Sequence, residues 1–157
     1  MKPETERYLD KARQVLSEAR AVAGIDLAEA AGRAAYLAAF HAAQALIFER
    51  IGKVPKTHHG VHAQFSRLAR NEPRIGIELP RFLSQAYDFK TVADYEIGPD
   101  ATVPLLEAIS AIEAAQRFID RIVELLNDRA NHAARNMPNP RIPSKRGGGC
   151  AAVTSSA

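Results

Sequence analysis

The chain has 157 residues, with 21 Lys and Arg against 18 Asp and Glu and a formal net charge of +3. This length favours one domain with a single core, and one cysteine, Cys150, excludes both an internal disulfide framework and a cysteine-based zinc site. The charged first twenty residues do not resemble a secretory signal, and the uncharged stretch 34–48 is shorter than the roughly 20 residues of a membrane-spanning helix. The composition therefore predicts a soluble, cytoplasmic protein with no membrane partner.

Helical patterns cover most of residues 1–128, and strand patterns are nearly absent. The first predicted helix spans residues 3–23, with apolar residues at steps of three and four and Gly24 at its end. The second begins with Asp26 as the N-cap and continues to Gly52. It is rich in alanine and apolar over more than half of its circumference, which is typical of a central helix.

Three more helices are predicted after a connector with Pro55. The third begins at Thr57 or Gly60 and ends at Arg70, the fourth spans residues 78–95, and the fifth spans residues 103–127. Short links, no strand pattern and no repeat indicate an all-α fold, an antiparallel bundle of four to five helices over residues 1–129.

The segment 130–157 has a different composition. It contains three prolines and a triple glycine, so we expect a disordered basic tail that buries too little apolar surface to fold. Five basic residues and no acidic residue follow Asp128, and the remaining 16 of the 21 basic residues are outnumbered by 18 acidic ones. Within the folded part, positive charge is concentrated between Arg33 and Lys90, either as a phosphate-binding region or as an ordinary solvated surface.

Five histidines raise the question of a metal site. His58 and His62 are four residues apart and could share one helical face, but two ligands are too few, so no metal site and no cofactor are predicted. His41 lies in the alanine-rich helix, where a core histidine with one satisfied nitrogen is the favoured interpretation. The sequence has no serine nucleophile elbow and no glycine-rich phosphate loop.

Three motifs in order resemble the HEPN domain superfamily. They are an R-A-x-Y-x-A-x-F-H-A-A helix within residues 32–69, the K-T-H-x-G-V connector that follows in the same segment, and K-T-V-A-D-Y-E at residues 90–96, where the family branch has R-x-x-A-D-Y. The resemblance covers roughly residues 5–126. It implies an antiparallel helical bundle that dimerises, and in many members a metal-independent ribonuclease or the toxin of a toxin–antitoxin pair with a minimal nucleotidyltransferase as antitoxin.

The nucleolytic members use an Arg separated from a His by four to six residues. No histidine of this chain has an arginine at that spacing before it, so the sequence leaves open whether the chain is an enzyme. The resemblance places Lys90, Asp94 and Tyr95 at the corresponding helix end. The first hypothesis is a ribonuclease with an altered site, in which Lys90 binds phosphate, His58 transfers a proton, Asp94 orients, and Arg33 and Lys56 support RNA binding.

The alternative hypothesis is a non-catalytic HEPN dimer that binds nucleotide or RNA and forms a complex with a nucleotidyltransferase partner. By resemblance, Tyr95 is then the tyrosine that the partner would modify. Simpler structural roles also remain open for these residues: a local pair of Asp94 with Lys90 at i,i+4, packing of Tyr95 against the bundle end, and anchoring of the connector by Lys56 and His58.

Overall fold

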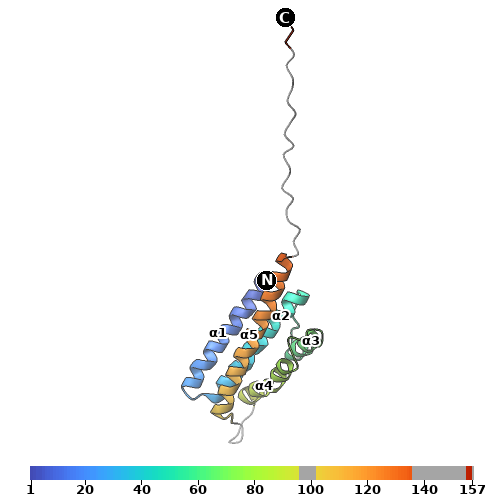
Figure 1. Ribbon diagram of the computed structural model, residues 1–157. Coiled ribbons are helices and arrows are strands. Elements are labelled where there is room, and N and C mark those ends of the chain that lie inside the picture. Colours follow the sequence, from blue (N-terminus) through green and yellow to red (C-terminus); the bar gives the residue numbers. More distant parts are fainter. Residues whose placement is uncertain (96–101, 136–154, 157) are drawn as a thin grey trace.

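The computed structural model describes residues 1–95, 102–135 and 155–156, and Figure 1 shows the arrangement of its helices. Within these ranges the chain is all-helical, as predicted, and no strand occurs. The five helices are α1 (Pro3–Gly24), α2 (Ala28–Ile51), α3 (His58–Arg70), α4 (Glu78–Tyr95) and α5 (Leu105–Arg135).

Helix α2 is the centre of the bundle and contacts all four other helices. Half of its 24 residues are buried, and seven of these are alanines with no exposed surface. Helix α1 runs antiparallel to it, because the amide nitrogen of Lys2 and the hydroxyl of Thr5 both donate to Oε2 of Glu49 near the end of α2, at 2.9 and 2.6 Å. The predicted central position of this alanine-rich helix is confirmed.

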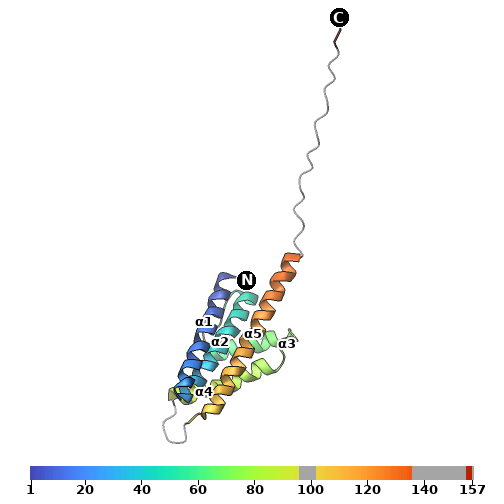
Figure 2. The same ribbon diagram turned by 60° about the vertical axis from the view of Figure 1, so that its left-hand side comes forward.

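Helix α5 lies beside α1 and α2, and α3 and α4 cover the other side of α2 (Figures 1 and 2). The apolar face of α5 packs into the interior of the bundle through Phe118. The centroid of this ring is 5.2 Å from that of Phe65 on α3, on which it stacks, and 6.3 Å from that of Phe82 on α4. Because Phe65 and Phe118 have no exposed surface, this contact holds α3 and α5 together at the interior of the bundle.

Two helix ends differ from the prediction. Asp26 is not an N-cap: it has a φ of 65°, the cap is Leu27, and no side chain caps α2. Helix α5 continues through Arg135, eight residues beyond the predicted end at Asn127, and its last turns project past the other helices in Figure 2. These turns are exposed, so burial does not stabilise them. Their alanines and arginines have high intrinsic helix propensity, which favours the helical conformation there. Residues 130–135, predicted as the beginning of the disordered tail 130–157, belong to α5 instead. The rest of that predicted tail lies outside the described residues, apart from 155–156.

Among the residues that the structure describes, no helix combines the length and the apolarity that crossing a membrane would require.

Candidate functional site

An ion-pair chain joins the end of α4 to the beginning of α2. Nε of Arg33 donates to Oδ1 of Asp94 at 2.7 Å, and Nζ of Lys90 donates to Oδ2 of the same carboxylate at 2.6 Å. Lys90 and Asp94 form the local i,i+4 pair that the sequence left open, whereas Arg33 reaches them from another helix. The structure thus brings three of the six predicted site residues into direct contact.

The ion-pair chain carries one more positive than negative charge. Hydrogen bonds from Lys90 and Arg33 hold the pKa of the Asp94 carboxyl below its usual value, and the bond to Asp94 raises the pKa of Lys90. Lys90 and Asp94 are therefore both charged at neutral pH. Only Nε of Arg33 is bonded within the described residues, and 42% of this side chain is exposed, so the donors of its terminal nitrogens are not used by the protein.

Gly32 allows α4 to approach α2 at this point. A Cβ atom on Gly32 would lie 2.9 Å from Cδ1 and 3.3 Å from Cβ of Phe89, closer than side chains normally pack. The absence of a side chain therefore sets the spacing of the two helices next to Arg33. This close packing is what allows the guanidinium to reach the Asp94 carboxylate from the neighbouring helix.

His58 begins α3 and is held by contacts with two residues of α2. The helix start is capped by Thr57, whose hydroxyl accepts from the Gly60 amide at 3.0 Å. The imidazole stacks on Phe40 with ring centroids 4.4 Å apart, and its Nδ1 is 2.7 Å from the hydroxyl of Tyr36. The connector residue thus does anchor its segment to the bundle, as the structural interpretation expected, while its Nε2 has no hydrogen bond within the described residues.

Tyr36 is the residue that the sequence interpretation missed. It has no exposed surface, and its hydroxyl bonds both Nδ1 of His58 and Nε2 of His62, at 2.7 and 2.9 Å. Burial, together with the nearby Tyr87 phenol, raises the pKa of Tyr36, so the hydroxyl remains protonated. The i,i+4 histidine pair that suggested a metal site therefore shares a tyrosine hydroxyl instead. The signal was the tyrosine inside the R-A-x-Y motif.

His58 is electrostatically connected to the ion-pair chain. Burial lowers the pKa of its imidazole, the positive charges of Lys90 and Arg33 lower it further, and Asp94 partly opposes them. No hydrogen bond joins His58 to these three groups within the described residues. The arrangement is a neutral imidazole beside a cationic pair, so His58 can accept a proton near a place where a phosphate could bind.

Tyr95 and Lys56 lie at the margins of this site. The Tyr95 side chain is 73% exposed, and Nζ of Lys90 is 5.4 Å from its ring centroid, a cation–π distance. It is therefore not packed into the end of the bundle. Lys56 is exposed in the connector, and no ion pair or hydrogen bond brings it to the ion-pair chain within the described part of the chain.

The histidine of the central helix, His41, matches its predicted role only in part. It is partly buried rather than in the core, but one ring nitrogen is satisfied, since its Nδ1 is 2.8 Å from Oε1 of Gln44, one turn away. Burial lowers the pKa of this imidazole. Across the described residues, no three His, Cys, Asp or Glu side chains are grouped as metal ligands.

Acidification from pH 6.5 to pH 4 is expected to destabilise the protein through His62. Burial lowers the pKa of His62 from 6.5 to about 4. In this range the unfolded state binds a proton that the folded state excludes, so the stabilisation is complete above pH 6.5 and is lost as the pH falls toward 4. After allowance for solvent screening at a half-buried ring, the loss is on the order of 1–2 kcal/mol.

Urea unfolding at pH 7.0, 5.5 and 4.5 measures this effect. His62→Gln, which can still bond the tyrosine hydroxyl, should show a shallower pH dependence than the unmodified chain. His132→Gln, a change at an exposed histidine on α5, serves as the control and should keep the original slope. Identical slopes for all three proteins would show that His62 does not titrate as stated.

The comparisons with known proteins agree with this architecture. Residues 5–126 match the HEPN domain family. The chain is also 30% identical, over 128 residues, to a Methanocaldococcus jannaschii protein named "Putative toxin MJ0605"; the match covers 82% of this chain and 92% of that protein. The bundle, the ion-pair chain at the expected motif and these two matches lead to one conclusion. The chain belongs to the HEPN domain family.

Proposed function

We propose that this HEPN protein is the RNA-directed component of a toxin–antitoxin type module and acts as a metal-independent ribonuclease with an altered site. The observation that carries the proposal is the convergence of Arg33 and Lys90, from two helices, on the carboxylate of Asp94, with His58 nearby. The relationship to a protein named as a toxin supports the biological setting.

The cationic pair supplies the part of the reaction that binds phosphate. Asp94 fixes Lys90 and only one nitrogen of Arg33, so the two terminal nitrogens of the guanidinium can donate to a phosphate oxygen. Preorganised cations at this position stabilise the charge that develops on the phosphate during cleavage. Asp94 acts as a positioning residue, and Lys56 adds positive charge along the path of the RNA.

His58 supplies the proton transfer in this proposal. A base at Nε2 requires Nδ1 to carry the proton, so the N–H of His58 donates to the Tyr36 oxygen and the Tyr36 hydroxyl donates to Nε2 of His62. The lowered pKa of His62 fits an unprotonated acceptor. In this tautomer His58 removes the proton of a ribose 2′-hydroxyl, whose oxygen then attacks the adjacent phosphorus. The bond from phosphorus to the 5′-oxygen breaks, a 2′,3′-cyclic phosphate forms, and the departing 5′-oxygen takes a proton from solvent.

A second candidate function is a non-catalytic dimer that binds nucleotide or RNA and associates with a minimal nucleotidyltransferase. The absent Arg-x4-6-His motif and the contact of Asp94 with both cations favour it, because RNA must compete with that carboxylate. In this function the exposed Tyr95 hydroxyl attacks the α-phosphorus of a nucleoside triphosphate held by the partner. An O–P bond forms, pyrophosphate leaves and the phenolic proton passes to solvent.

One experiment separates the two functions. Single-stranded and structured RNAs are incubated with the protein in excess chelator, beside Lys90→Ala, His58→Ala and the control Arg13→Ala, which breaks the exposed Arg13–Asp10 pair on α1. If the protein is a ribonuclease, it cleaves RNA in chelator. The cleavage rate should fall by about tenfold or more in Lys90→Ala and His58→Ala and stay unchanged in Arg13→Ala.

Intact RNA in every reaction would reject the ribonuclease. The binding function would then require retention of RNA or nucleotide by the unmodified chain and weaker retention by Lys90→Ala. With a nucleotidyltransferase and ATP, intact-mass measurement should show a nucleotidyl adduct on the protein and none on Tyr95→Phe. Sedimentation velocity of the same sample tests the proposed homodimer.

A further inference from the structure

A polar hollow lies at the opposite end of α2 from the ion-pair chain. Arg33 and Arg50 are 17 residues apart on this helix, which corresponds to about 25 Å at a rise of 1.5 Å per residue. The hollow has a volume of about 310 Å³ and lies where the end of α2, the link between α3 and α4, and the late turns of α5 meet. Its lining residues are Arg50, Glu72, Arg74, Asp128, Arg129 and His132.

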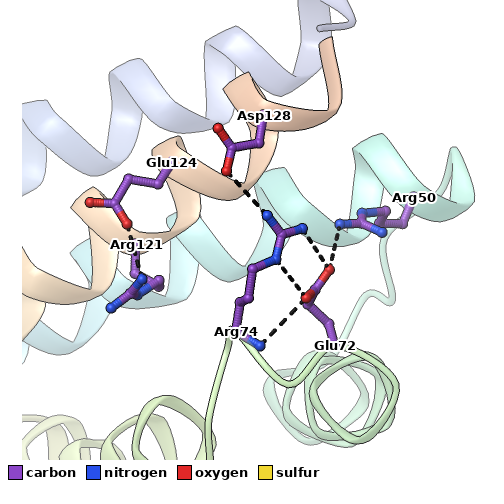
Figure 3. A network of polar contacts seen from close by, with 6 residues as sticks. All are labelled: Arg50, Glu72, Arg74, Arg121, Glu124 and Asp128. Carbon is purple, nitrogen blue, oxygen red and sulfur yellow. Dashed lines mark hydrogen bonds and ion pairs between the residues drawn. The ribbon is translucent and has the colours of Figure 1, made fainter. Parts of the chain in front are cut away.

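Arg74 organises this hollow from the link between α3 and α4. Its Nε and Nη2 form a two-pronged contact with the carboxylate of Glu72 at 2.9 and 3.0 Å, and its Nη1 reaches Asp128 of α5 at 3.1 Å (Figure 3). Nη2 of Arg50 lies 3.6 Å from Glu72, on the other side of the same carboxylate. The link is therefore held to α2 and α5 by charged contacts that also fix the wall of the hollow.

The positive charges here exceed the negative ones. Three guanidinium groups, those of Arg50, Arg74 and Arg129, line the hollow with only two carboxylates, and Arg50 and Arg74 are the ones that pair with Glu72 and Asp128. Burial lowers the pKa of Arg50, and the positive charge of the neighbouring Arg129 lowers it further. The two carboxylates compensate only part of this positive charge, so a bound anion would further reduce the repulsion among the three arginines.

Arg50 is also incompletely satisfied. Its Nε is buried and has no hydrogen-bond partner within the described residues, although the remainder of the guanidinium reaches the Glu72 carboxylate. A buried N–H donor without an acceptor costs on the order of 1–3 kcal/mol. Arg129, in contrast, is exposed at the rim, and no ion pair holds it within the described part of the chain.

We infer that this hollow is a binding site for a phosphate group, either inorganic phosphate or the phosphate of a small monoester. Arg50 of α2 and Arg129 of α5 both line the hollow and would hold the phosphate oxygens, while Arg74 remains bound to its two carboxylates. A guanidinium pair suits a phosphate because each presents paired donors. The volume accommodates the anion together with part of an attached group.

The inference does not depend on the proposed function, since it concerns different residues at the other end of the bundle. A phosphate bound here would also join α2 and α5, which are separate in the sequence. Ligand binding to the folded state alone stabilises it, so the site predicts a phosphate-dependent rise in the unfolding temperature.

Isothermal titration calorimetry and thermal unfolding of the full chain test the site. Inorganic phosphate, adenosine monophosphate and adenosine are titrated separately, with sodium chloride added to a constant ionic strength. Saturable binding of the first two and none of adenosine is expected. Tighter binding of the monophosphate than of phosphate would identify a monoester as the natural occupant, and equal affinities would identify the free anion.

Three variants decide whether the hollow is responsible. Arg129→Gln, at an exposed position, should weaken phosphate binding by at least about tenfold without changing the fold, and Arg50→Gln should weaken it similarly. Arg121→Gln, which removes an exposed arginine of α5 paired with Glu124, is the matched control and should bind normally. Absent saturation, normal binding by Arg129→Gln, or equal weakening by Arg121→Gln would overturn the inference.

Discussion

Replacing Phe118 with alanine is expected to lower the free energy of unfolding by about 3–5 kcal/mol. The ring has no exposed surface and lies between Phe65 of α3 and Phe82 of α4, so its removal leaves a cavity where three helices meet. Rigid helical neighbours cannot close such a cavity completely, and both the lost transfer free energy and the lost contacts contribute. Urea unfolding followed by far-ultraviolet circular dichroism measures the change.

The same substitution at Phe48 is the control. Phe48 is only partly buried, near the end of α2, with its ring 6.1 Å from that of Tyr8. Its removal should therefore destabilise the protein clearly less than that of Phe118. Equal losses at the two positions would mean that the α3–α5 contact is not part of the rigid core.

Gly32→Leu is expected to reduce stability by about 2–3 kcal/mol and, in addition, to break the contact between Arg33 and Asp94. Leucine favours the helix more than glycine does, so the loss must come from the collision of its side chain with Phe89, whose Cδ1 would be 2.9 Å from the new Cβ. Moving α4 away separates the Asp94 carboxylate from the guanidinium of the adjacent Arg33.

Two measurements separate the steric cost from the effect on the site. Urea unfolding gives the stability, and carboxyl-detected NMR titration should show the pKa of Asp94 moving up toward its ordinary value when Arg33 is lost as a partner. Gly24→Leu is the control, because a Cβ atom on Gly24 meets nothing within 4 Å. An unchanged Asp94 titration in a destabilised Gly32→Leu protein would contradict the role given to Gly32.

The helices and their order could be predicted because their apolar residues repeat at helical spacing and short polar links separate them. Capping residues and apolar spacing were less informative about where individual helices begin and end. Asp26 has the right chemistry for an N-cap, but the chain turns there through a left-handed conformation. The end of α5 could not be found from apolar periodicity, since residues 127–135 are helical without being buried.

The candidate site could be predicted only in part, because a sequence shows which residues share a helix face but not which helices pack together. Lys90 and Asp94 share a helix, so their pairing follows from spacing, whereas the approach of Arg33 depends on how two helices pack. Tyr36 appeared to be one more apolar residue of a central helix, because a sequence does not show that two histidines from the next helix would reach its hydroxyl. The arginines of the polar hollow likewise come together only through tertiary structure.

The alanines of α2 have a consequence for the balance of folding free energy. A buried alanine has no side-chain rotamers to lose, whereas a buried methionine or glutamine loses up to about 2 kcal/mol of side-chain conformational entropy. Seven such residues lie with no exposed surface on the helix that contacts every other helix. The segment with the most neighbours is thus among those that give up the least side-chain freedom when the bundle forms.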